Sequence, residues 1–326
     1  MSKEIKKTLI ITNKDDAHAD AVIARANGLG YGEKTIRLNT EDFNSNCKVV
    51  FDGNDYKVFL KDSLRSFFAH ELAAVWYRRP KPIDVSNVED EGVATFIQQQ
   101  AESAMRGLFF LTHETARWVN PLPALHFARQ KLPQLKIARQ IGFSVPATLV
   151  SNDPDEVKKF FALNKIVCNK SLDEPNYMMQ GRMHTYLTQK FSSFDEIASE
   201  VDSVRVCPTM FQEYIEKEKD VRVVIIGDQV TAVEIDSQAE KLSEIDFRGI
   251  SPHLLKHSKH NLPADVSELV KKFVRYYGLL FSAMDLVLDK KGTYYFIENN
   301  CNGQWLWLDN LAGTNLVDDM IHLLYE

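Results

Sequence analysis

The chain has 326 residues, and at about 150 residues per domain this length predicts two or three domains. Apolar residues make up 44% and charged residues 26% of the sequence, which excludes the disordered, collagen-like and fibrous classes. The 39 Lys and Arg residues against 45 Asp and Glu residues give a net charge of −6. Because this balance offers no basic surface for a phosphate backbone, no nucleic-acid partner is expected.

Location and redox chemistry are also constrained by the sequence. The longest apolar runs, such as 279–284, are far shorter than the roughly 18 residues of a membrane-spanning helix, so no membrane association is expected. Residues 1–7 lead directly into an apolar run and lack the length and cleavage site of a secretory signal. A cytoplasmic protein is therefore predicted. The cysteines form no closely spaced pair, and neither a disulfide framework nor a thiolate metal site is expected.

The first predicted domain spans residues 1–120 and is an α/β unit. An apolar strand at 8–12 precedes a helix at 17–26, which Asp16 begins and Gly28 ends. The other predicted elements, in chain order, are a strand at 35–38, an alternating segment at 49–60, a strand at 73–77 and a long helix at 89–112.

The central domain is predicted at residues 121–208, and its pattern alternates helix and strand. Its predicted elements are a helix at 125–141, an extended segment at 145–150, a helix at 154–162, a strand at 166–169 that leads to Lys170, a hairpin or loop at 171–188 and a helix at 194–201. The C-terminal domain is predicted at residues 209–326 and is rich in antiparallel sheet. Strands at 221–226 and 230–235 form a hairpin, and a helix at 263–277 ends at Gly278.

The most informative region is a second predicted hairpin. Apolar strands at 281–288 and 293–297 are joined by Asp289-Lys290-Lys291-Gly292, a sequence typical of a type I turn. If the strand ends pair directly, Asp285 lies opposite Phe296. The sequence therefore predicts one polar face and one apolar face for this hairpin.

That polar face predicts a metal site. The side-chain period of two places Glu298 and Asn300 on the same face as Asp285, and a diagonal pair of residues lies roughly 7–8 Å apart. Mg²⁺ prefers oxygen ligands and is usually held by one or two carboxylates together with substrate phosphates. The alternatives are a solvated polar face on an edge hairpin, or a bulge at Gly292 that shifts the register.

These residues resemble the metal-binding end of the ATP-grasp ligases, which join a carboxylate to a nucleophile through an acyl phosphate. The resemblance rests on Asp285, Glu298-x-Asn300 and Gly303, and the order of motifs agrees along essentially the whole chain. It implies an ATP-grasp fold with ATP and Mg²⁺ as cofactors. The implied ATP contacts are Lys131 and Lys170 for the phosphates, and Gln212, Glu213, Tyr214 and Ile215 for the adenine. The implied arginines for the acyl phosphate are Arg222 and Arg248, in Asp220-x-Arg222 and Asp246-Phe247-Arg248.

Two further sequence motifs narrow the resemblance to one group of these ligases. Val75-Trp76-Tyr77-Arg78-Arg79-Pro80 and Asn302-Gly303-Gln304-Trp305-Leu306-Trp307 resemble the ligases that cyclise ribosomally made peptides of the microviridin, or graspetide, type. The resemblance implies that the enzyme phosphorylates Asp or Glu side chains of a precursor peptide. A Ser or Thr hydroxyl would then close an ω-ester, which is favoured here, or a Lys amine an ω-amide. It also implies a precursor with a leader and an acidic core, and a homodimer.

The residue chemistry agrees with this interpretation. Phosphoryl transfer depends on positioning and charge neutralisation, and a lysine that ends an apolar strand, as Lys170 does, points to the sheet end where ligands collect. The alternative for Lys131 and Lys170 is a solvated surface charge. Asp246 and Asp220 are candidate general bases.

Four residues are assigned to the peptide substrate. Arg78 and Arg79 are hypothesised to receive its acidic side chains, and the alternative is a strand end with solvated charge. Phe194 and Ile197, on the predicted helix at 194–201, are hypothesised to hold the leader together with the loop at 177–188. The alternative for that helix is ordinary packing.

Two competing functions remain open, and one metal site is rejected. A ligase that adds an amino acid to a small molecule or a protein tail would share these motifs, and so would a nucleotide-binding regulator without turnover. The intact acidic and amide set at 285, 298 and 300 argues against the regulator. His253, His257 and His260 have spacings that zinc could use, but no cysteine or carboxylate nearby completes a tetrahedral set.

Overall fold

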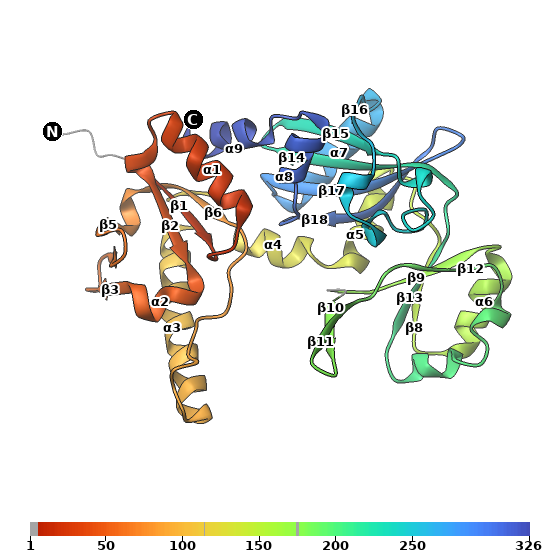
Figure 1. Ribbon diagram of the computed structural model, residues 1–326, viewed down its shortest axis with the longest axis horizontal. Helices are drawn as coiled ribbons and strands as arrows, with labels where there is room; N and C mark the ends of the chain where they lie inside the picture. Colours follow the sequence, from red (N-terminus) through yellow and green to blue (C-terminus); the bar gives the residue numbers. More distant parts are fainter. Residues whose placement is uncertain (1–5, 114, 174–175) are drawn as a thin grey trace.

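The computed structural model describes residues 6–113, 115–173 and 176–326, and the predicted mixed α/β class is confirmed. Three main sheets follow one another along the chain (Figure 1). Residues 1–5, on which the expected absence of a secretory signal depends in part, lie outside the described residues. Within the described ranges, no helix combines the length and apolar character needed to cross a membrane.

The N-terminal sheet is parallel, with strand order β2-β1-β6-β7. Its strands are β1 (Lys7–Thr12), β2 (Thr35–Asn39), β6 (Leu72–Tyr77) and β7 (Arg117–Val119). Strands covered on both faces need apolar residues at successive positions, and Leu9, Ile10 and Ile11 are all buried. Helices α1 (Ala17–Gly28), α2 (Phe43–Asn46) and α3 (Glu91–Thr112) and a small antiparallel sheet of β3 (Cys47–Phe51), β4 (Tyr56–Leu60) and β5 (Arg65–Phe68) complete this part.

The predicted helix at 125–141 is two helices, α4 (Leu122–Ala128) and α5 (Lys131–Ile141). Pro133 explains the break, because a proline inside a helix has no N–H to donate and its ring clashes with the preceding turn. The second helix therefore begins at Lys131, which puts Pro133 in its first turn, where proline is tolerated. Both helices contribute buried residues to the core of the C-terminal sheet.

The central sheet is antiparallel, with strand order β12-β9-β13-β8. Its elements are β8 (Thr148–Ser151), α6 (Pro154–Leu163), β9 (Val167–Lys170), β12 (Gln189–Phe191) and β13 (Thr209–Glu213). The predicted hairpin forms from β10 (Asn176–Met179) and β11 (Arg182–Thr185), and residues 174–175 lie outside the described residues. Gln180 and Gly181 both have positive φ, as a two-residue hairpin turn of right-handed twist requires.

The predicted α-helix at 194–201 is wrong. The segment forms two 3₁₀ turns, Phe194–Glu196 and Val201–Arg205. So short a stretch with Asp, Ser and β-branched residues gains little from α-helical hydrogen bonds. The turns instead bring Phe194 and Ile197 against the small core around Phe161.

The C-terminal sheet is antiparallel, with strand order β16-β15-β14-β17-β18. Its strands are β14 (Lys217–Ile226), β15 (Gln229–Ile235), β16 (His257–His260), β17 (Phe281–Asp289) and β18 (Tyr294–Asn300), and its helices are α7 (Ala264–Tyr277), α8 (Leu306–Ala312) and α9 (Leu316–Tyr325). The predicted helix at 263–277 is α7, whose buried residues pack into the core of this sheet, and Gly278 ends it in the left-handed conformation. Helix α9 lies beside α1, which joins the two ends of the chain in one core (Figure 1).

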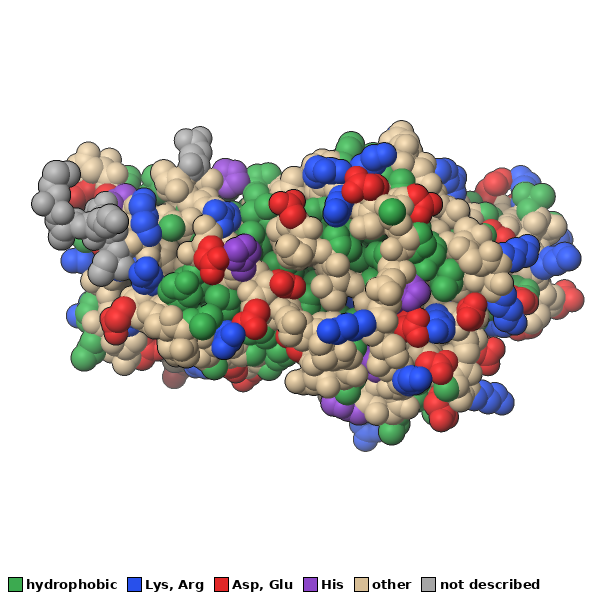
Figure 2. All heavy atoms as spheres, turned by 90° about the horizontal axis from the view of Figure 1, so that it is seen from above, with side chains coloured by type: hydrophobic (Ala, Val, Ile, Leu, Met, Phe, Trp, Pro, Cys, Tyr) green, Lys and Arg blue, Asp and Glu red, His purple; other side chains and the backbone are tan. Residues whose placement is uncertain are grey.

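The surface carries no single-sign field on the face shown in Figure 2, where basic and acidic side chains are interspersed. This distribution agrees with the net charge of −6. It gives that face no continuous basic track for a phosphate backbone.

Candidate functional site

A cleft of about 890 Å³ opens to solvent between the central and C-terminal sheets. It receives side chains from β9, from the end of β13, from the loop at 245–248 and from β17 and β18. The predicted site residues that line it are Lys131, Lys170, Gln212, Glu213, Tyr214, Ile215, Asp220, Asp246, Arg248, Asp285 and Glu298. The fold thus gathers in one cleft residues that are spread over more than half of the sequence.

The two carboxylates predicted to bind a metal pair more directly than expected. Asp285 pairs with Glu298 and not with Phe296, because the register shifts between Asp285 and Leu286. Leu286 pairs with Phe296, so Ile297 is the extra residue of a β-bulge. Directly paired side chains lie about 4.5–5.5 Å apart at Cβ, closer than the predicted diagonal.

The bulge also exchanges the faces of the first half of β18. Phe296, which the predicted register placed opposite Asp285, is instead buried in the core with Met284, whereas Tyr295 and Ile297 are half-buried. Ile297 lines the cleft beside Glu298. A bulge that shifts the register was one of the predicted alternatives, but it was expected at Gly292. The bulge occurs instead at Ile297, five residues later.

Asp285 is bound by Arg222 from the neighbouring strand β14. One guanidinium nitrogen, Nη1, lies 2.8 Å from both carboxylate oxygens, and Nη2 donates to the Gln304 carbonyl at 2.9 Å. Burial raises the pKa of Asp285, and the facing Glu298 carboxylate adds to the rise although Arg222 opposes it. Bringing a further cation between the two acids would relieve their repulsion.

Glu298 lies among several cations. Its carboxylate is 3.4 Å from Lys131 Nζ, which also donates to the Ser171 carbonyl at 2.8 Å. Burial alone would raise the pKa of Glu298, but Lys131, Arg248 and Lys170 outweigh it and lower that pKa. The glutamate is therefore held ionised, as a metal ligand must be.

Asn300 stands at the exposed end of β18, two residues beyond Glu298, and does not line the cleft. Its side-chain oxygen accepts a hydrogen bond from the Asn302 amide at 3.0 Å. The amide oxygen has a second lone pair for a cation. Carboxylate and amide oxygens beside lysines and arginines fit magnesium with a polyphosphate, so Asp285, Glu298 and Asn300 are the residues that would hold it.

Two of the three histidines considered for zinc have protein partners in the structure. Throughout the described ranges, no three His, Cys, Asp or Glu side chains gather as metal ligands would. His257 contacts the Leu255 carbonyl, and His260 contacts Glu234 and Tyr294.

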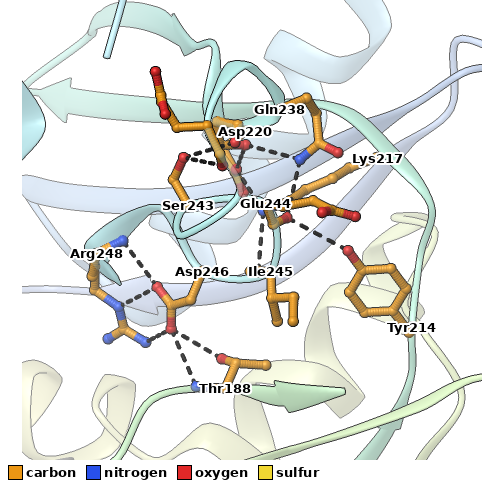
Figure 3. A network of polar contacts seen from close by, with 12 residues as sticks. Thr188, Tyr214, Lys217, Asp220, Gln238, Ser243, Glu244, Ile245, Asp246 and Arg248 are labelled. Carbon is orange, nitrogen blue, oxygen red and sulfur yellow. Dashed lines mark hydrogen bonds and ion pairs between the residues drawn. The ribbon is translucent and has the colours of Figure 1, made fainter. Parts of the chain in front are cut away.

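Asp246 and Arg248, which both line the cleft, form a closed pair (Figure 3). Arg248 binds both oxygens of Asp246 at 2.8 and 2.7 Å, and the Thr188 hydroxyl donates to Asp246 at 3.0 Å. Burial alone would raise the pKa of Asp246, but these contacts hold it well below its usual value. A carboxylate so stabilised in its ionised form is a weak proton acceptor, which argues against Asp246 as the general base.

Asp220 is engaged in a second polar network on the same side of the cleft (Figure 3). Lys217 Nζ lies 2.7 Å from its carboxylate, and the Ser237 hydroxyl donates to it at 2.5 Å. Lys217 also donates to the Ile245 carbonyl at 3.2 Å. Asp220 and Lys217 thus anchor the loop that carries Asp246, and this structural duty argues against Asp220 as the base.

The predicted adenine segment leaves β13 at the back of the cleft. Gln212 is buried and donates from Nε2 to Thr148 at 3.0 Å, while its Oε1 has no hydrogen-bond partner among the described residues. The Tyr214 amide donates to the Ile166 carbonyl at 2.9 Å, and Lys190 Nζ lies 4.2 Å from the centre of the Tyr214 ring. A buried acceptor without a partner and an aromatic ring in the lining of one cleft suit a flat heterocycle with an amino group.

The residues assigned to the peptide lie outside this cleft. Arg78 is only 1% exposed and donates to the Asn302 carbonyl at 2.5 Å, so a peptide could not reach it directly, whereas Arg79 is exposed. Phe194 and Ile197 are half-buried in the central core, so they offer little surface to a leader. These two positions agree with the ordinary-packing alternative.

Sequence patterns missed several residues that shape the site. Lys217 and Thr188 line the cleft. Gln134 holds the backbone of Asn299 near the end of β18, and His18 holds the backbone beyond that strand. A single lysine, threonine or glutamine carries no spacing signal of its own. Only the fold shows that these side chains converge.

Two family models together match almost the whole chain. The family model of the MvdD pre-ATP grasp domain matches residues 7–126, and that of the RimK-like ATP-grasp domain matches residues 128–324. No curated protein matches the chain.

Solved structures resemble the whole chain. A Chryseobacterium gregarium RiPP-associated ATP-grasp ligase, in complex with ADP and a leader and core peptide, has a TM-score of 0.86 and 27% identity over 98% of this chain and 96% of that chain. Macrocyclase MdnC from Microcystis aeruginosa MRC, bound with precursor peptide MdnA, has a TM-score of 0.82 and 24% identity over 98% and 99%. The ATP-grasp ligase PsnB, complexed with a phosphomimetic variant of its minimal precursor, Mg and ADP, has a TM-score of 0.75 and 21% identity over 98% of both chains.

Proposed function

The chain belongs to the RimK-like ATP-grasp family, and we propose that it is an ATP-dependent ligase that closes rings in a ribosomally made precursor peptide. The observation that carries the proposal is the cleft in which Asp285 and Glu298 face each other among lysines and arginines. The pre-ATP grasp match at residues 7–126 and the likeness to peptide macrocyclases over 98% of the chain support a peptide substrate.

The residues of the cleft divide the reaction between them. Bound magnesium would neutralise phosphate charge, with Asp285, Glu298 and Asn300 as its ligands. Lys131 and Lys170 bind and orient the phosphates of ATP, and the segment Gln212, Glu213, Tyr214 and Ile215 lines the base. A side-chain carboxylate of the peptide attacks the γ-phosphorus and ADP leaves. The hydroxyl or amine nucleophile then attacks the acyl carbon, and phosphate leaves with the proton that the nucleophile gives up. Arg222 and Arg248 stabilise the charge of the phosphate.

Ring formation is measured by mass. The chain, ATP, Mg²⁺ and a candidate precursor with repeated Thr and Glu or Asp should yield ADP and a peptide lighter by one water per ring. Glu298→Gln should abolish both products, whereas Glu268→Gln, on the outer surface of α7, should preserve them. If the peptide is unchanged and ADP forms only when an amino acid is supplied as acceptor, the chain is the ligase that extends a small molecule or a protein tail. If the nucleotide binds but is not turned over, the chain is the regulator.

We propose ester rings as the favoured product, from the resemblance of Asn302–Trp307 to the microviridin ligases. Mild alkali distinguishes the products, because an ester reopens and regains the water mass whereas an amide does not. A cyclised product whose mass stays constant in alkali would replace ester with amide.

The leader is proposed to bind at the β10–β11 hairpin. Tyr177, Met178, Met179 and Met183 are all exposed there, Met183 to 71%, and methionines adapt to varied apolar partners. Replacing Met178 and Met183 with Ser should raise KM for the full precursor and leave ADP binding unchanged. Leu163→Ser, at a residue 84% exposed on α6, is the matched control.

Arg79 remains the proposed contact for acidic side chains of the core peptide. It is exposed and follows the end of β6, and a guanidinium binds a carboxylate through two hydrogen bonds. Arg79→Leu should raise KM for the peptide and spare ATP binding. An unchanged KM would remove Arg79 from the proposal.

A homodimer through α3 is proposed as well. The helix projects from the N-terminal part (Figure 1), and Val93, Phe96 and Ile97 lie on one side of its first half, where no residue from 91 to 104 is buried. Side chains three and four positions apart form one helix face, which a second copy of α3 could cover by symmetry. Light scattering should find a dimer that Phe96→Asp dissociates and Leu163→Asp does not.

A further inference from the structure

Residues 299–306 connect the end of β18, where the proposed metal ligands lie, to the start of α8. Buried side chains form hydrogen bonds to the backbone of this segment. Gln134 accepts from the Asn299 amide and donates to its carbonyl, both at 2.8 Å. Asn120 donates to the Cys301 carbonyl at 2.9 Å. Arg78 of the N-terminal domain donates to the carbonyl of residue 302 at 2.5 Å. The N-terminal domain therefore also helps to hold this segment.

His18 of α1 makes the last contacts of the series. Its Nε2 accepts hydrogen bonds from the backbone amides of Trp305 and Leu306 at 3.0 and 3.1 Å. The indole of Trp305 is fully buried and packs edge-on against the imidazole, with ring centres 5.1 Å apart. An acceptor for two amides must carry no proton, so the imidazole is neutral with its proton on Nδ1. Nδ1 lies 3.5 Å from Asp16, which orients the ring.

One residue before these amides, the Gln304 carbonyl accepts from Arg222 Nη2 at 2.9 Å, and Arg222 Nη1 binds both oxygens of Asp285. The position of the Gln304 carbonyl therefore sets the guanidinium, and the guanidinium sets the carboxylate. His18 binds the Trp305 amide, which belongs to the same peptide unit as this carbonyl, and the Leu306 amide of the next unit. A contact made in the N-terminal domain thus reaches the metal site through Gln304 and Arg222.

We propose that His18 is a positioning residue for the metal site: by holding the amides of Trp305 and Leu306 it fixes Gln304 and, through Arg222, the carboxylate of Asp285. The inference rests on the proposed function insofar as it takes Asp285 as a magnesium ligand. Under this inference the N-terminal domain contributes to binding of the magnesium nucleotide, and this role is separate from any contact with the peptide.

Protonation of His18 would break the arrangement, because Nε2–H would then face two other N–H groups. The charged and titratable groups around the ring are Asp16, Arg78 and Arg79. Burial lowers the pKa of His18, and the two arginines add to the decrease while Asp16 opposes it. The neutral form is thus held at neutral pH and lost only as the pH falls through this lowered pKa.

Two substitutions separate positioning from simple packing. His18→Leu fills the space but leaves two amides without an acceptor. His18→Gln keeps an acceptor oxygen and an amide that can donate to Asp16, and it does not titrate. His322→Gln replaces an exposed histidine of α9 that pairs with Glu326 and serves as the control.

The probe is ADP, titrated by calorimetry with and without Mg²⁺, with thermal unfolding recorded to confirm that each variant is folded. His18→Leu should bind Mg·ADP roughly tenfold more weakly, the effect of leaving a buried donor unpaired, and bind metal-free ADP like the wild type. His18→Gln should restore Mg·ADP binding and retain it at acid pH, where the wild type and His322→Gln lose it.

Equal weakening of metal-free ADP and Mg·ADP in folded His18→Leu would overturn the inference, as would an acid loss of binding unchanged in His18→Gln. Neither result would touch the proposed function, since the wild type would still bind the magnesium nucleotide. A wild type that binds no nucleotide would instead refute the proposed function itself.

Discussion

Gly303 is the tightest point of the segment behind the metal site, and adding a methyl group there tests its geometry. A Cβ on Gly303 would lie 2.8 Å from Ala283 Cβ and 2.8 Å from Arg222 Nη2, well inside the contact distance of about 3.5–4.0 Å. Ala283 is fixed in β17, so Arg222 or the segment must move. Forced shifts of this kind cost about 1–3 kcal/mol, and a weakened charged hydrogen bond costs about 1.5–3 kcal/mol.

Gly303→Ala should therefore weaken Mg·ADP binding by about 10-fold to 100-fold, since each 1.4 kcal/mol is about a factor of ten. Calorimetric titration measures this effect, and thermal unfolding separates it from global destabilisation. The control is Gly107→Ala in α3, where a Cβ meets nothing within 4 Å and alanine should stabilise the helix by about 0.5–1 kcal/mol. A folded Gly303→Ala variant that binds Mg·ADP as tightly as the wild type would refute the proposed link between Arg222 and the metal site.

Three further outcomes are expected. Lys217→Met should cost about 3–5 kcal/mol of unfolding free energy, because it leaves the buried Asp220 carboxylate unpaired, and chemical denaturation should show a smaller loss when Asp220→Asn is added. Gln134→Leu should lower stability by about 1–3 kcal/mol for each unpaired backbone group of Asn299, again by denaturation. The lowered pKa of Asp246 should contribute stability that is present above pH ~4 and lost as the pH falls below it; Asp246→Asn should lack that part of the acid decrease in melting temperature.

The order of secondary structure was predictable because local rules decide it. The N-terminal strand and helix, the long α3, and α7 with its glycine stop follow the predicted pattern within a few residues. Two helix predictions failed where a local rule was overlooked or overridden. Pro133 divides α4 from α5, and the segment at 194–201 gives up helical bonds to pack Phe194 on a small core.

The composition of the site was more predictable than its geometry. Acidic residues at the spacing of Asp285 and Glu298 indicated that the two would meet, but the bulge at Ile297 decides that they pair directly. A bulge depends on how β18 packs against the core, and no local sequence signal marks it here. Burial was equally hidden, because adjacent Arg78 and Arg79 look alike in sequence and yet point to opposite environments.

The ion pair between Arg222 and Asp285 would prepare the proposed metal site and would not compete with it. A carboxylate offers about four lone-pair positions, and Arg222 uses one nitrogen to bind both oxygens, so positions remain for a cation. Removing the arginine would free those positions but leave two facing carboxylates, Asp285 and Glu298, with less positive charge to offset their repulsion. Arg222→Lys keeps the charge, but its single nitrogen cannot occupy both the Nη1 position at Asp285 and the Nη2 position at the Gln304 carbonyl. The guanidinium is therefore required for its shape as well as its charge, because only a planar fork reaches the carboxylate and the backbone carbonyl together.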